Sequence, residues 1–303
     1  MSRAVSFSSY GTPEVLEVID VPEVHPGEGQ VRVAVRSAGL NPFDVKVRHG
    51  VLPKLMLPSG QGSEFAGVID EVGADAGEWQ VGDEVLGWIG RGAQAEHVVV
   101  SASSIARKPA ALDWTIAGGI GLVGNTAKRA TASLSLGGRD TVLVTGAAGG
   151  VGLLSAQLAR RAGATVVGTA SERNHEFLRG LGITPVAYGP GMSDRLREAA
   201  PQGFTAALDN VGGESIEAAL ALGIPPQRIN TIADHAAAEK YGLGSVGGGG
   251  KTAEELAELA TLVASGELVL PVRASYPLDE VRTAYEDLET GHGLGKIVLS
   301  LGA

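Results

Sequence analysis

Three glycines, at positions 146, 149 and 152, are the clearest sign of chemistry in this chain. They follow the β-branched run Thr141-Val142-Leu143-Val144 and open an apolar, helix-forming segment. A strand that ends in a glycine loop and then opens a helix brings backbone N–H groups and the helix dipole close to an anion. The predicted ligand is the pyrophosphate of a dinucleotide. The predicted contacts are Gly146, Ala147, Gly149, Gly150, Val151 and Gly152.

The segments around the loop are stronger evidence for a dinucleotide site than the glycines alone. Because 45 of the 303 residues are glycine, some glycine spacing will match a dinucleotide-binding motif by chance. A second apolar strand is predicted over 165–169, shortly after the loop. Strand, loop, helix and strand together form a βαβ unit of about 30 residues, the length typical of dinucleotide-binding folds. A tight structural turn without a ligand is the alternative.

The end of the second strand selects the dinucleotide. An acidic side chain there would bind the adenosine ribose and favour NADH. This chain has Ala170, Ser171 and Arg173, which offer room, a hydrogen-bond donor and a positive charge for a 2′-phosphate. We therefore predict NADPH, with Ser171 and Arg173 as ligands. Glu172 would favour NADH if its side chain turned inward; otherwise it is a solvated acid at a helix start.

Composition excludes several other chemistries. The chain contains no cysteine, which removes disulfides, thiol nucleophiles and cysteine-based zinc sites. Its six histidines lack metal-ligand spacing, so we predict no metal. A net charge of −10 without a basic run argues against nucleic acid and anionic membranes as partners. With 44% apolar residues but no signal segment or membrane span, the sequence predicts a cytoplasmic protein with sizeable cores.

The secondary structure predicted to position these residues changes along the chain, from antiparallel strands to alternating strands and helices. Alternating apolar and polar residues predict antiparallel strands over 15–21, 30–36, 68–72, 84–88 and 95–100, typical of a small barrel-like domain. From residue 114, strands and helices alternate, which predicts one doubly wound parallel sheet. The predicted helices are 114–135, 151–162, 174–181, 193–200, 214–222 and 252–265. The predicted strands are 141–145, 165–169, 185–188, 204–209 and 228–232.

The end of the chain returns to short strands. Those over 269–273 and 295–300 are predicted to pair with the N-terminal domain. The expected fold is therefore α/β: a β-rich domain, residues 1–112 and 266–303, into which a Rossmann domain, residues 113–265, is inserted. The glycine-rich stretch 242–250 predicts a flexible loop, either a lid or a plain linker.

Five ordered motifs carry a family resemblance over nearly the whole chain. They are Asn41-Pro42-Phe43-Asp44 and residues 60–67 (GQGSEFAG), 81–87 (VGDEVLG), 146–152 (GAAGGVG) and 295–299 (GKIVL). In this order they resemble the medium-chain dehydrogenase/reductase superfamily and, within it, the zinc-free quinone oxidoreductase (zeta-crystallin-like) branch. The resemblance implies that the β-rich domain is GroES-like. Zinc-dependent relatives have a metal-binding histidine where this chain has Ser63.

The resemblance implies an activity: NADPH-dependent hydride transfer, without a metal, to a quinone or to the β-carbon of an α,β-unsaturated carbonyl. It implies that Asn41 lies beside the nicotinamide as an amide donor, although this residue also suits a cap of the turn at Pro42. Asp44 is implied to orient a water or Lys46, or is a helix-start acid. A conjugated acceptor needs an aimed hydride, a donor to its carbonyl and then a proton.

Further cofactor contacts are also implied by the resemblance. Thr126 is implied to lie near the nicotinamide, and the backbone of Asn210, Val211 and Ala233 to line its side of the crevice at the strand ends. Lys296, in the last motif, is implied to bind the cofactor as well. Relatives commonly dimerise, so a homodimer is expected.

The substrate pocket is the least defined part of the prediction. Apolar or aromatic side chains that could shape its mouth are Phe43, Trp88, Leu122 and Tyr241. His49, Lys46 and Tyr241 are candidates for the proton donor, with solvent as the alternative.

Three hypotheses follow from these patterns. The first is an NADPH quinone or enone reductase. The second is a trans-acting enoyl reductase of a polyketide or fatty-acyl pathway, for which the loop over 244–250 must admit a long chain. The third is a non-catalytic NADPH-binding protein, which the intact cofactor loop argues against.

Overall fold

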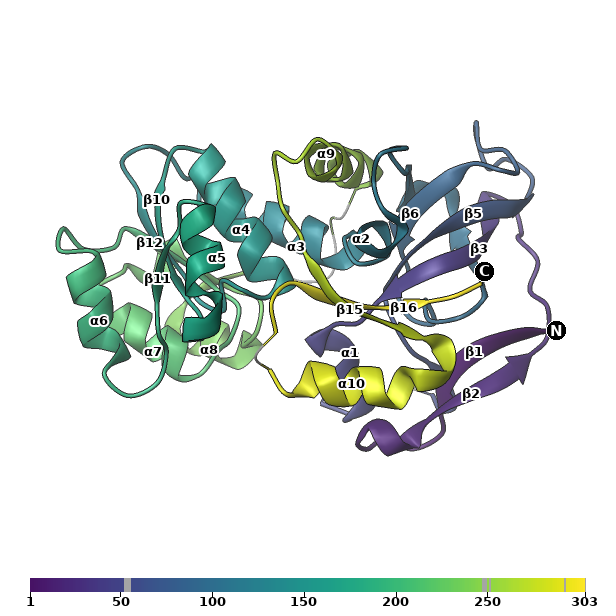
Figure 1. The fold of residues 1–303 in the computed structure, drawn as a ribbon, viewed down its shortest axis with the longest axis horizontal. Coiled ribbons are helices and arrows are strands. Elements are labelled where there is room, and N and C mark those ends of the chain that lie inside the picture. Colours follow the sequence, from purple (N-terminus) through teal and green to yellow (C-terminus); the bar gives the residue numbers. More distant parts are fainter. Residues whose placement is uncertain (52–55, 247–249, 251, 292, 303) are drawn as a thin grey trace. The chain divides into compact units, whose positions relative to one another are not determined.

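The computed structural model describes residues 1–51, 56–246, 250, 252–291 and 293–302. The chain folds into two compact units, which we call unit 1 (Met1–Leu122 and Thr252–Ala303) and unit 2 (Val123–Lys251) (Figure 1). Unit 2 is therefore inserted into unit 1, and the sequence analysis likewise expects one domain to be inserted into the other. The sequence-based boundaries fall at residues 113 and 265, whereas the units meet along the chain at residues 122 and 252.

A six-stranded parallel sheet forms the centre of unit 2. Its strands are β9 (Thr141–Val144), β10 (Thr165–Thr169), β11 (Thr184–Val186), β12 (Ala206–Asp209), β13 (Ile229–Thr231) and β14 (Gly244–Ser245). The spatial order is β11-β10-β9-β12-β13-β14. Numbered within the unit, this order is 3-2-1-4-5-6, that of dinucleotide-binding Rossmann folds. The predicted doubly wound sheet is confirmed.

Helices connect these strands. They are α4 (Gly150–Arg161), α5 (His175–Gly180), α6 (Met192–Ala199), α7 (Glu214–Ala221) and α8 (His235–Tyr241), with short 3-10 turns at η3 (Glu172–Asn174) and η4 (Pro226–Arg228). Crossovers between parallel strands are right-handed, so α4 and α5 cover one face of the sheet and α7 and α8 the other. The order of strands reverses between β9 and β12, where ligands of such sheets bind at the carboxyl ends.

The long helix predicted over 114–135 is wrong. The structure has two helices instead, α2 (Trp114–Gly118) and α3 (Gly121–Ala132). A Cβ atom at Gly118 would lie 2.3 Å from the Ser37 hydroxyl, and one at Gly121 would lie 2.3 Å from the Gly87 carbonyl oxygen. The glycines therefore allow the backbone to approach the neighbouring strands, and the helix is interrupted where it does so.

Unit 1 contains a seven-stranded and a three-stranded sheet. The larger sheet consists of β3 (Gln30–Gly39), β5 (Glu64–Val72), β6 (Glu84–Trp88), β7 (His97–Ser101), β8 (Ile105–Arg107), β15 (Val272–Pro277) and β16 (Lys296–Ser300). The smaller one consists of β1 (Ser2–Phe7), β2 (Leu16–Val21) and β4 (Ser59–Gly60). β16 pairs antiparallel with β3, which confirms that the end of the chain completes the N-terminal domain.

In the described part of unit 1, helices and 3-10 turns accompany these sheets. They are α1 (Pro42–Arg48), α2, α9 (Ala253–Ala264), α10 (Val281–Glu289), η1 (Pro13–Val15), η2 (Ala102–Ser104) and η5 (Leu278–Glu280). The sequence analysis missed α10, which buries Val281, Ala284 and Tyr285 in the core of unit 1. It assigned the segment of α9 to the cofactor domain, whereas the structure counts this helix in unit 1.

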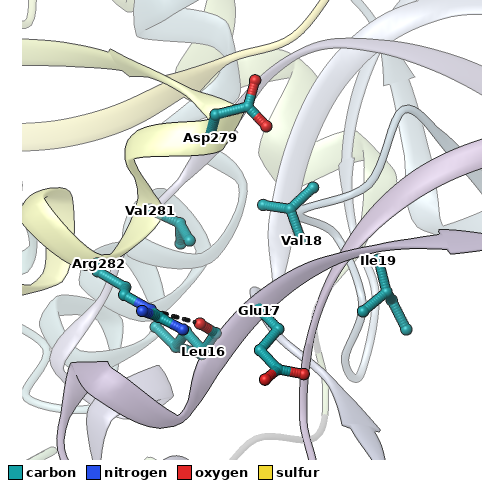
Figure 2. Close-up of a pocket in the computed structure, with 7 residues that line it drawn as sticks. All are labelled: Leu16, Glu17, Val18, Ile19, Asp279, Val281 and Arg282. Atoms are coloured by element: carbon teal, nitrogen blue, oxygen red, sulfur yellow. Dashed lines mark hydrogen bonds between the residues drawn. The ribbon is translucent and has the colours of Figure 1, made fainter.

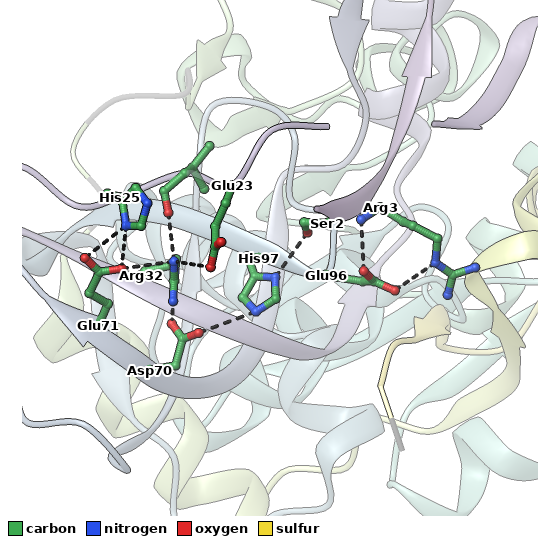
Figure 3. Close-up of polar contacts among 10 residues, drawn as sticks. Ser2, Arg3, Glu23, His25, Arg32, Asp70, Glu71, Glu96 and His97 are labelled. Carbon is green, nitrogen blue, oxygen red and sulfur yellow. Dashed lines mark hydrogen bonds and ion pairs between the residues drawn. The ribbon is translucent and has the colours of Figure 1, made fainter. Parts of the chain in front are cut away.

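A network of charged side chains crosses the outer surface of β3, β5 and β7 (Figure 3). Arg32 is its centre: Nε lies 2.9 Å from Asp70, and Nη1 lies 3.1 Å from Glu23 and 2.9 Å from Glu71. Its other members are His25, His97, Ser2, Arg3 and Glu96. Arg32 is 11% exposed, but its carboxylate partners are 29–55% exposed. Ion pairs with solvent-exposed partners contribute little stability, so we assign this network to the surface and not to function.

The predicted loop over 242–250 is partly a strand. Gly244 and Ser245 pair with Asn230 and Thr231 as β14, the edge of the parallel sheet. Residues 247–249 of the predicted loop lie outside the described residues. Within the described part of the chain, no helix has the length and apolarity needed to cross a bilayer.

Candidate active site

A cluster of buried polar side chains lies inside unit 1. Asn41 precedes α1, Glu64 begins β5 and Lys296 begins β16, while Asp44 lies in the first turn of α1 and Ser63 just before β5. All five are at most 3% exposed. Burial of so many polar groups is costly unless each is paired, so the pairing defines the site.

Lys296 is the cation at the centre of the cluster. Its Nζ lies 2.8 Å from Glu64 Oε1, and it donates to Asn41 Oδ1 at 2.7 Å and to the Leu40 carbonyl at 2.6 Å. The Asn41 Nδ2 in turn donates to Glu64 Oε1 at 2.8 Å. Strand β16 thus brings together three residues that are far apart in the sequence.

The second oxygen of Glu64 reaches the beginning of α3. Glu64 Oε2 accepts a hydrogen bond of 2.6 Å from the backbone N–H of Leu122. The first N–H groups of a helix have no intrahelical acceptor, and a carboxylate there is favoured by the helix dipole. Glu64 therefore serves both Lys296 and the first turn of α3.

Asp44 is the titratable group of the cluster that burial perturbs most clearly. Its Oδ2 accepts from the Asn41 backbone N–H at 2.9 Å, which forms part of a capping box, and its Oδ1 accepts from Ser63 Oγ at 3.0 Å. The pKa of Asp44 is raised from 3.8 to about 7: burial is the largest cause and the Glu64 charge adds to it, while the Ser63 hydrogen bond and the Lys296 charge oppose the shift. Asp44 can therefore change its protonation near neutral pH.

Tyr285 of α10 lies next to this cluster, and the sequence analysis did not single it out. Gln94 Nε2 donates to its hydroxyl at 2.9 Å, and Arg48 lies over its ring, 5.0 Å from the centroid. Burial raises the pKa of Tyr285 well above its ordinary value, and the nearby Asp44 charge adds to the effect. The phenol is thus a neutral part of the core, connected to Asp44 through Gln61, whose Nε2 donates to the Asp44 carbonyl at 3.3 Å.

The predicted phosphate loop has the geometry of a dinucleotide cradle in unit 2. Gly146 has φ +61°, and Gly149 caps α4. A Cβ at residue 152 would lie 2.2 Å from the Gly146 carbonyl oxygen, so only glycine allows α4 to start this close to the loop. The free first-turn N–H groups of this twelve-residue helix then point to the loop, which fits a pyrophosphate.

Asp209 fixes the strand ends beside this loop. It accepts hydrogen bonds from Thr145 Oγ1 at 2.7 Å, Thr231 Oγ1 at 2.6 Å and the backbone N–H groups of Val211 and Gly212. The sequence analysis used only the backbone that follows Asp209. The structure shows that this buried carboxylate joins the ends of β9, β12 and β13.

The end of β10 carries the residues predicted to select NADPH. Ser171 is half-buried and accepts a hydrogen bond of 3.2 Å from Asn174 Nδ2, while Glu172 and Arg173 are exposed on the turn η3. The exposed Glu172 agrees with a solvated acid. Ala170 is buried, and its carbonyl contacts the His175 ring at 3.1 Å.

The structure distributes the other predicted residues over both units. In unit 1, Phe43 is 43% exposed on α1, His49 is exposed where α1 ends, and Trp88 is half-buried at the end of β6. Also half-buried are Leu122 and Thr126 of α3, Tyr241 at the end of α8, and Asn210 and Ala233 after their strands, while Val211 is exposed. Only Asn41, Asp44 and Lys296 of the predicted set are brought into one buried cluster.

A surface hollow of about 380 Å³ opens in unit 1 beside β2 (Figure 2). Its lining residues come from β2 and from the segment 279–282, where Arg282 Nε donates to the Leu16 carbonyl at 2.7 Å. None of the residues predicted from the motifs lines this hollow, so it does not mark the candidate active site.

The donor set of the cluster does not fit zinc. The chain has no cysteine, and in the described ranges no three histidine or carboxylate side chains are grouped as metal ligands. Ser63, at the position of the metal-binding histidine, instead donates to Asp44. We therefore derive no step through a metal.

Comparisons with known proteins agree with this fold. Residues 27–110 match the model of the alcohol dehydrogenase GroES-like domain, and residues 181–299 match that of the zinc-binding dehydrogenase family. A quinone oxidoreductase of Pseudomonas aeruginosa is 30% identical over 99% of both chains. The solved Escherichia coli quinone oxidoreductase complexed with NADPH superposes with a TM-score of 0.88 at 26% identity, over 98% of this chain and 99% of that one.

A solved enoyl reductase, CurK, is similar as well, with a TM-score of 0.87 and 25% identity over 99% of both chains. The full-length likeness, the two domains and the strand order all agree. The chain belongs to the medium-chain dehydrogenase/reductase superfamily, among the oxidoreductases of its quinone oxidoreductase branch. One of the matching family models has zinc in its name, but the chain has no cysteine, and no group of metal-binding side chains is found among the residues that the structure describes.

Proposed function

We propose that this protein transfers a hydride from NADPH to a quinone or to the β-carbon of an α,β-unsaturated carbonyl, without a metal. The observation that carries the proposal is the close approach of α4 to the Gly146 carbonyl at Gly152, which forms a pyrophosphate cradle at the reversal point of the sheet. The matched quinone oxidoreductases supply the class of reaction.

NADPH is the proposed cofactor, and when bound it supplies the hydride. The similar E. coli enzyme is complexed with NADPH. In this chain, Arg173 and Ser171 stand at the end of β10, where a 2′-phosphate requires a positive charge and a donor. The backbone after β12 and β13, held by Asp209, would line the nicotinamide side.

The polar cluster of unit 1 is proposed to serve the acceptor. The Asn41 amide has one N–H engaged by Glu64 and a second that can donate to a carbonyl on which negative charge develops. The final proton is proposed to come from solvent, because both Asp44 oxygens are engaged by donors of the protein, the Asn41 backbone N–H and Ser63 Oγ. The protein is further proposed to act as a homodimer, as its resemblance implies.

An enoyl reductase that acts on acyl thioesters is the second candidate, and the likeness to CurK favours it. Both candidates use the same hydride donor and differ in what the acceptor carbonyl is attached to. The acceptor profile therefore separates them.

The test is NADPH oxidation at 340 nm with a quinone, a simple enone, an enoyl thioester or no acceptor, with NADH in parallel. Acceptor-dependent oxidation of NADPH by quinone or enone is expected. Preference for the thioester would support the second candidate. Tight NADPH binding without turnover on any acceptor would contradict both and support the non-catalytic alternative.

A further inference from the structure

We propose that Lys296 and Glu64 are positioning residues that hold the side-chain amide of Asn41 in a single orientation. The inference rests on the proposed function, in which this amide serves the acceptor. It differs from the expectation that Lys296 itself binds the cofactor, and the geometry of the three side chains carries it.

The chemistry of its two neighbours determines the orientation of the amide. An ammonium can only donate, so the group that Lys296 Nζ meets at 2.7 Å must be the Asn41 oxygen. An ionised carboxylate can only accept, so the group that lies 2.8 Å from Glu64 Oε1 must be the Asn41 nitrogen. A flip of the amide would place donor against donor and acceptor against acceptor. The cation and anion therefore define which edge of the amide carries its remaining N–H.

The ammonium of Lys296 makes two hydrogen bonds and one ion pair within the protein. It carries three N–H groups, and three acceptors surround it: the Leu40 carbonyl, Asn41 Oδ1 and Glu64 Oε1, at 2.6, 2.7 and 2.8 Å. Its side chain is 3% exposed. A direct bond from Lys296 to the cofactor would therefore compete with its ion pair to Glu64.

The backbone of Asn41 is restrained as well. Its N–H donates to Asp44 Oδ2 in the capping box of α1, and Pro42 follows it with a restricted φ. With the amide and the backbone both fixed, the second Nδ2 hydrogen has a defined direction. A donor preorganised in this way costs no reorganisation when charge develops on an acceptor.

Stability alone gives little reason for such a pair. Replacing a buried ion pair with apolar groups of similar volume is often neutral or stabilising, because desolvation offsets the attraction. A buried Lys296–Glu64 pair that also orients a third polar side chain has a role that apolar residues could not take over.

A double-mutant cycle in the full-length protein tests the proposal. Its variants are Lys296→Met, Asn41→Ala and the double variant, and the readouts are kcat and KM for the acceptor and the Kd for NADPH. We expect Lys296→Met and Asn41→Ala each to lower kcat about 100-fold. The double variant should be no slower than Asn41→Ala, because Lys296 acts through Asn41. NADPH affinity should stay unchanged in Lys296→Met.

Two further variants keep the test interpretable. Lys296→Met leaves Glu64 buried without its cation, so Lys296→Met/Glu64→Gln, which removes both charges at similar volume, serves if the single variant does not fold. Lys108→Met is the matched control, because Lys108 is another buried lysine of unit 1, 3.0 Å from Glu84. It should lose stability but retain kcat.

A spectroscopic readout is independent of activity. The chain contains only five asparagines, so selective ¹⁵N labelling gives five side-chain amide pairs, and Asn41→Ala assigns one of them. In folded Lys296→Met, the Asn41 pair should shift and broaden more than the other four, whereas Lys108→Met should leave it unchanged.

The outcomes separate the two levels of the proposal. Wild-type protein without turnover, but with an Asn41 pair that responds to Lys296→Met, would refute the proposed function and leave the positioning intact. Multiplicative losses in the cycle, a raised Kd for NADPH in Lys296→Met, or an Asn41 pair unaffected by that substitution would each overturn the positioning role.

Discussion

The carbonyl oxygen of Gly146 lies 2.2 Å from the point that a Cβ atom of residue 152 would occupy. The two glycines belong to the same loop, but their roles differ from that of Gly149 between them. A Cβ at Gly149 would meet the same oxygen at 3.5 Å, an ordinary contact, and φ at Gly149 is −77°. The fold therefore requires glycine at position 152, whereas the folded protein alone does not require it at position 149.

Gly152→Ala should destabilise the protein, although alanine favours helices, because the contacted atom is backbone and cannot move aside. We expect the free energy of unfolding to fall by about 1–3 kcal/mol. Gly149→Ala should unfold as the wild type does but bind NADPH more weakly, since its methyl group would stand where the phosphate approaches. Urea unfolding and NADPH fluorescence titration measure the two effects; equal stabilities of the two variants would contradict the assignment.

Asp209→Asn should loosen the strand ends of unit 2. The Gly212 N–H lies 3.2 and 3.0 Å from the two Asp209 oxygens, so an amide nitrogen in either place faces another donor. We expect a loss of about 3 kcal/mol in urea unfolding. The control is Asp194→Asn, whose side chain is 81% exposed and whose removal of charge should change stability by less than about 0.5 kcal/mol. Similar losses of stability in both variants would contradict the role of the Asp209 hydrogen bonds in joining the strand ends.

Arg173→Ala should reduce the preference for NADPH. Without the guanidinium, the Kd for NADPH should rise about tenfold or more, since a phosphate contact is worth about 1.4 kcal/mol or more, while the Kd for NADH should stay unchanged. Arg179→Ala removes another exposed arginine of unit 2 and serves as the control. If the Kd values for NADPH and NADH rose by the same factor, Arg173 would not be binding the 2′-phosphate.

Asp44 should make stability depend on pH. Its folded pKa of about 7 lies above its ordinary value of 3.8, so the folded state holds a proton that the unfolded state releases. This contribution is fully present below pH 3.8 and is lost as the pH rises towards 7, by about 1.4 kcal/mol per pH unit. Above about pH 7 it changes no further.

Asp44→Asn removes this dependence while its amide can still accept from the Asn41 N–H and donate to Ser63 Oγ. Urea unfolding of both proteins between pH 5 and 8 gives the measurement. The wild type should lose stability relative to the variant up to about pH 7, and parallel profiles over this range would count against a raised pKa.

Local patterns were sufficient to predict most of unit 2. The predicted strand 165–169 has the same bounds as β10, and the helix predicted over 151–162 differs from α4 by one residue at each end. Such elements follow from periodicity and from the glycine loop, which are local in sequence. The helix α10 was missed although Val281, Ala284 and Leu288 have helical spacing, because the segment around it was interpreted as short strands.

The motifs indicated Asn41, Asp44 and Lys296 as site residues but did not indicate the contacts that connect them in the structure. Lys296 and Glu64 meet only because β16 and β5 both flank β3, which no local pattern indicates. The same holds for Tyr285, whose hydroxyl meets Gln94 across the core. Long-range pairing therefore limits what the sequence tells about the site.

The insertion of unit 2 also has a consequence for synthesis on the ribosome. Glu64 is made early, but its cation, Lys296, and the strand that carries it come after the whole of unit 2. Strand β3 likewise lacks its β16 partner until then. During synthesis, the first segment of unit 1 therefore stays incomplete while the parallel sheet of unit 2, which is contiguous in sequence, can already form. Unit 1 is completed last, when the final strand is made.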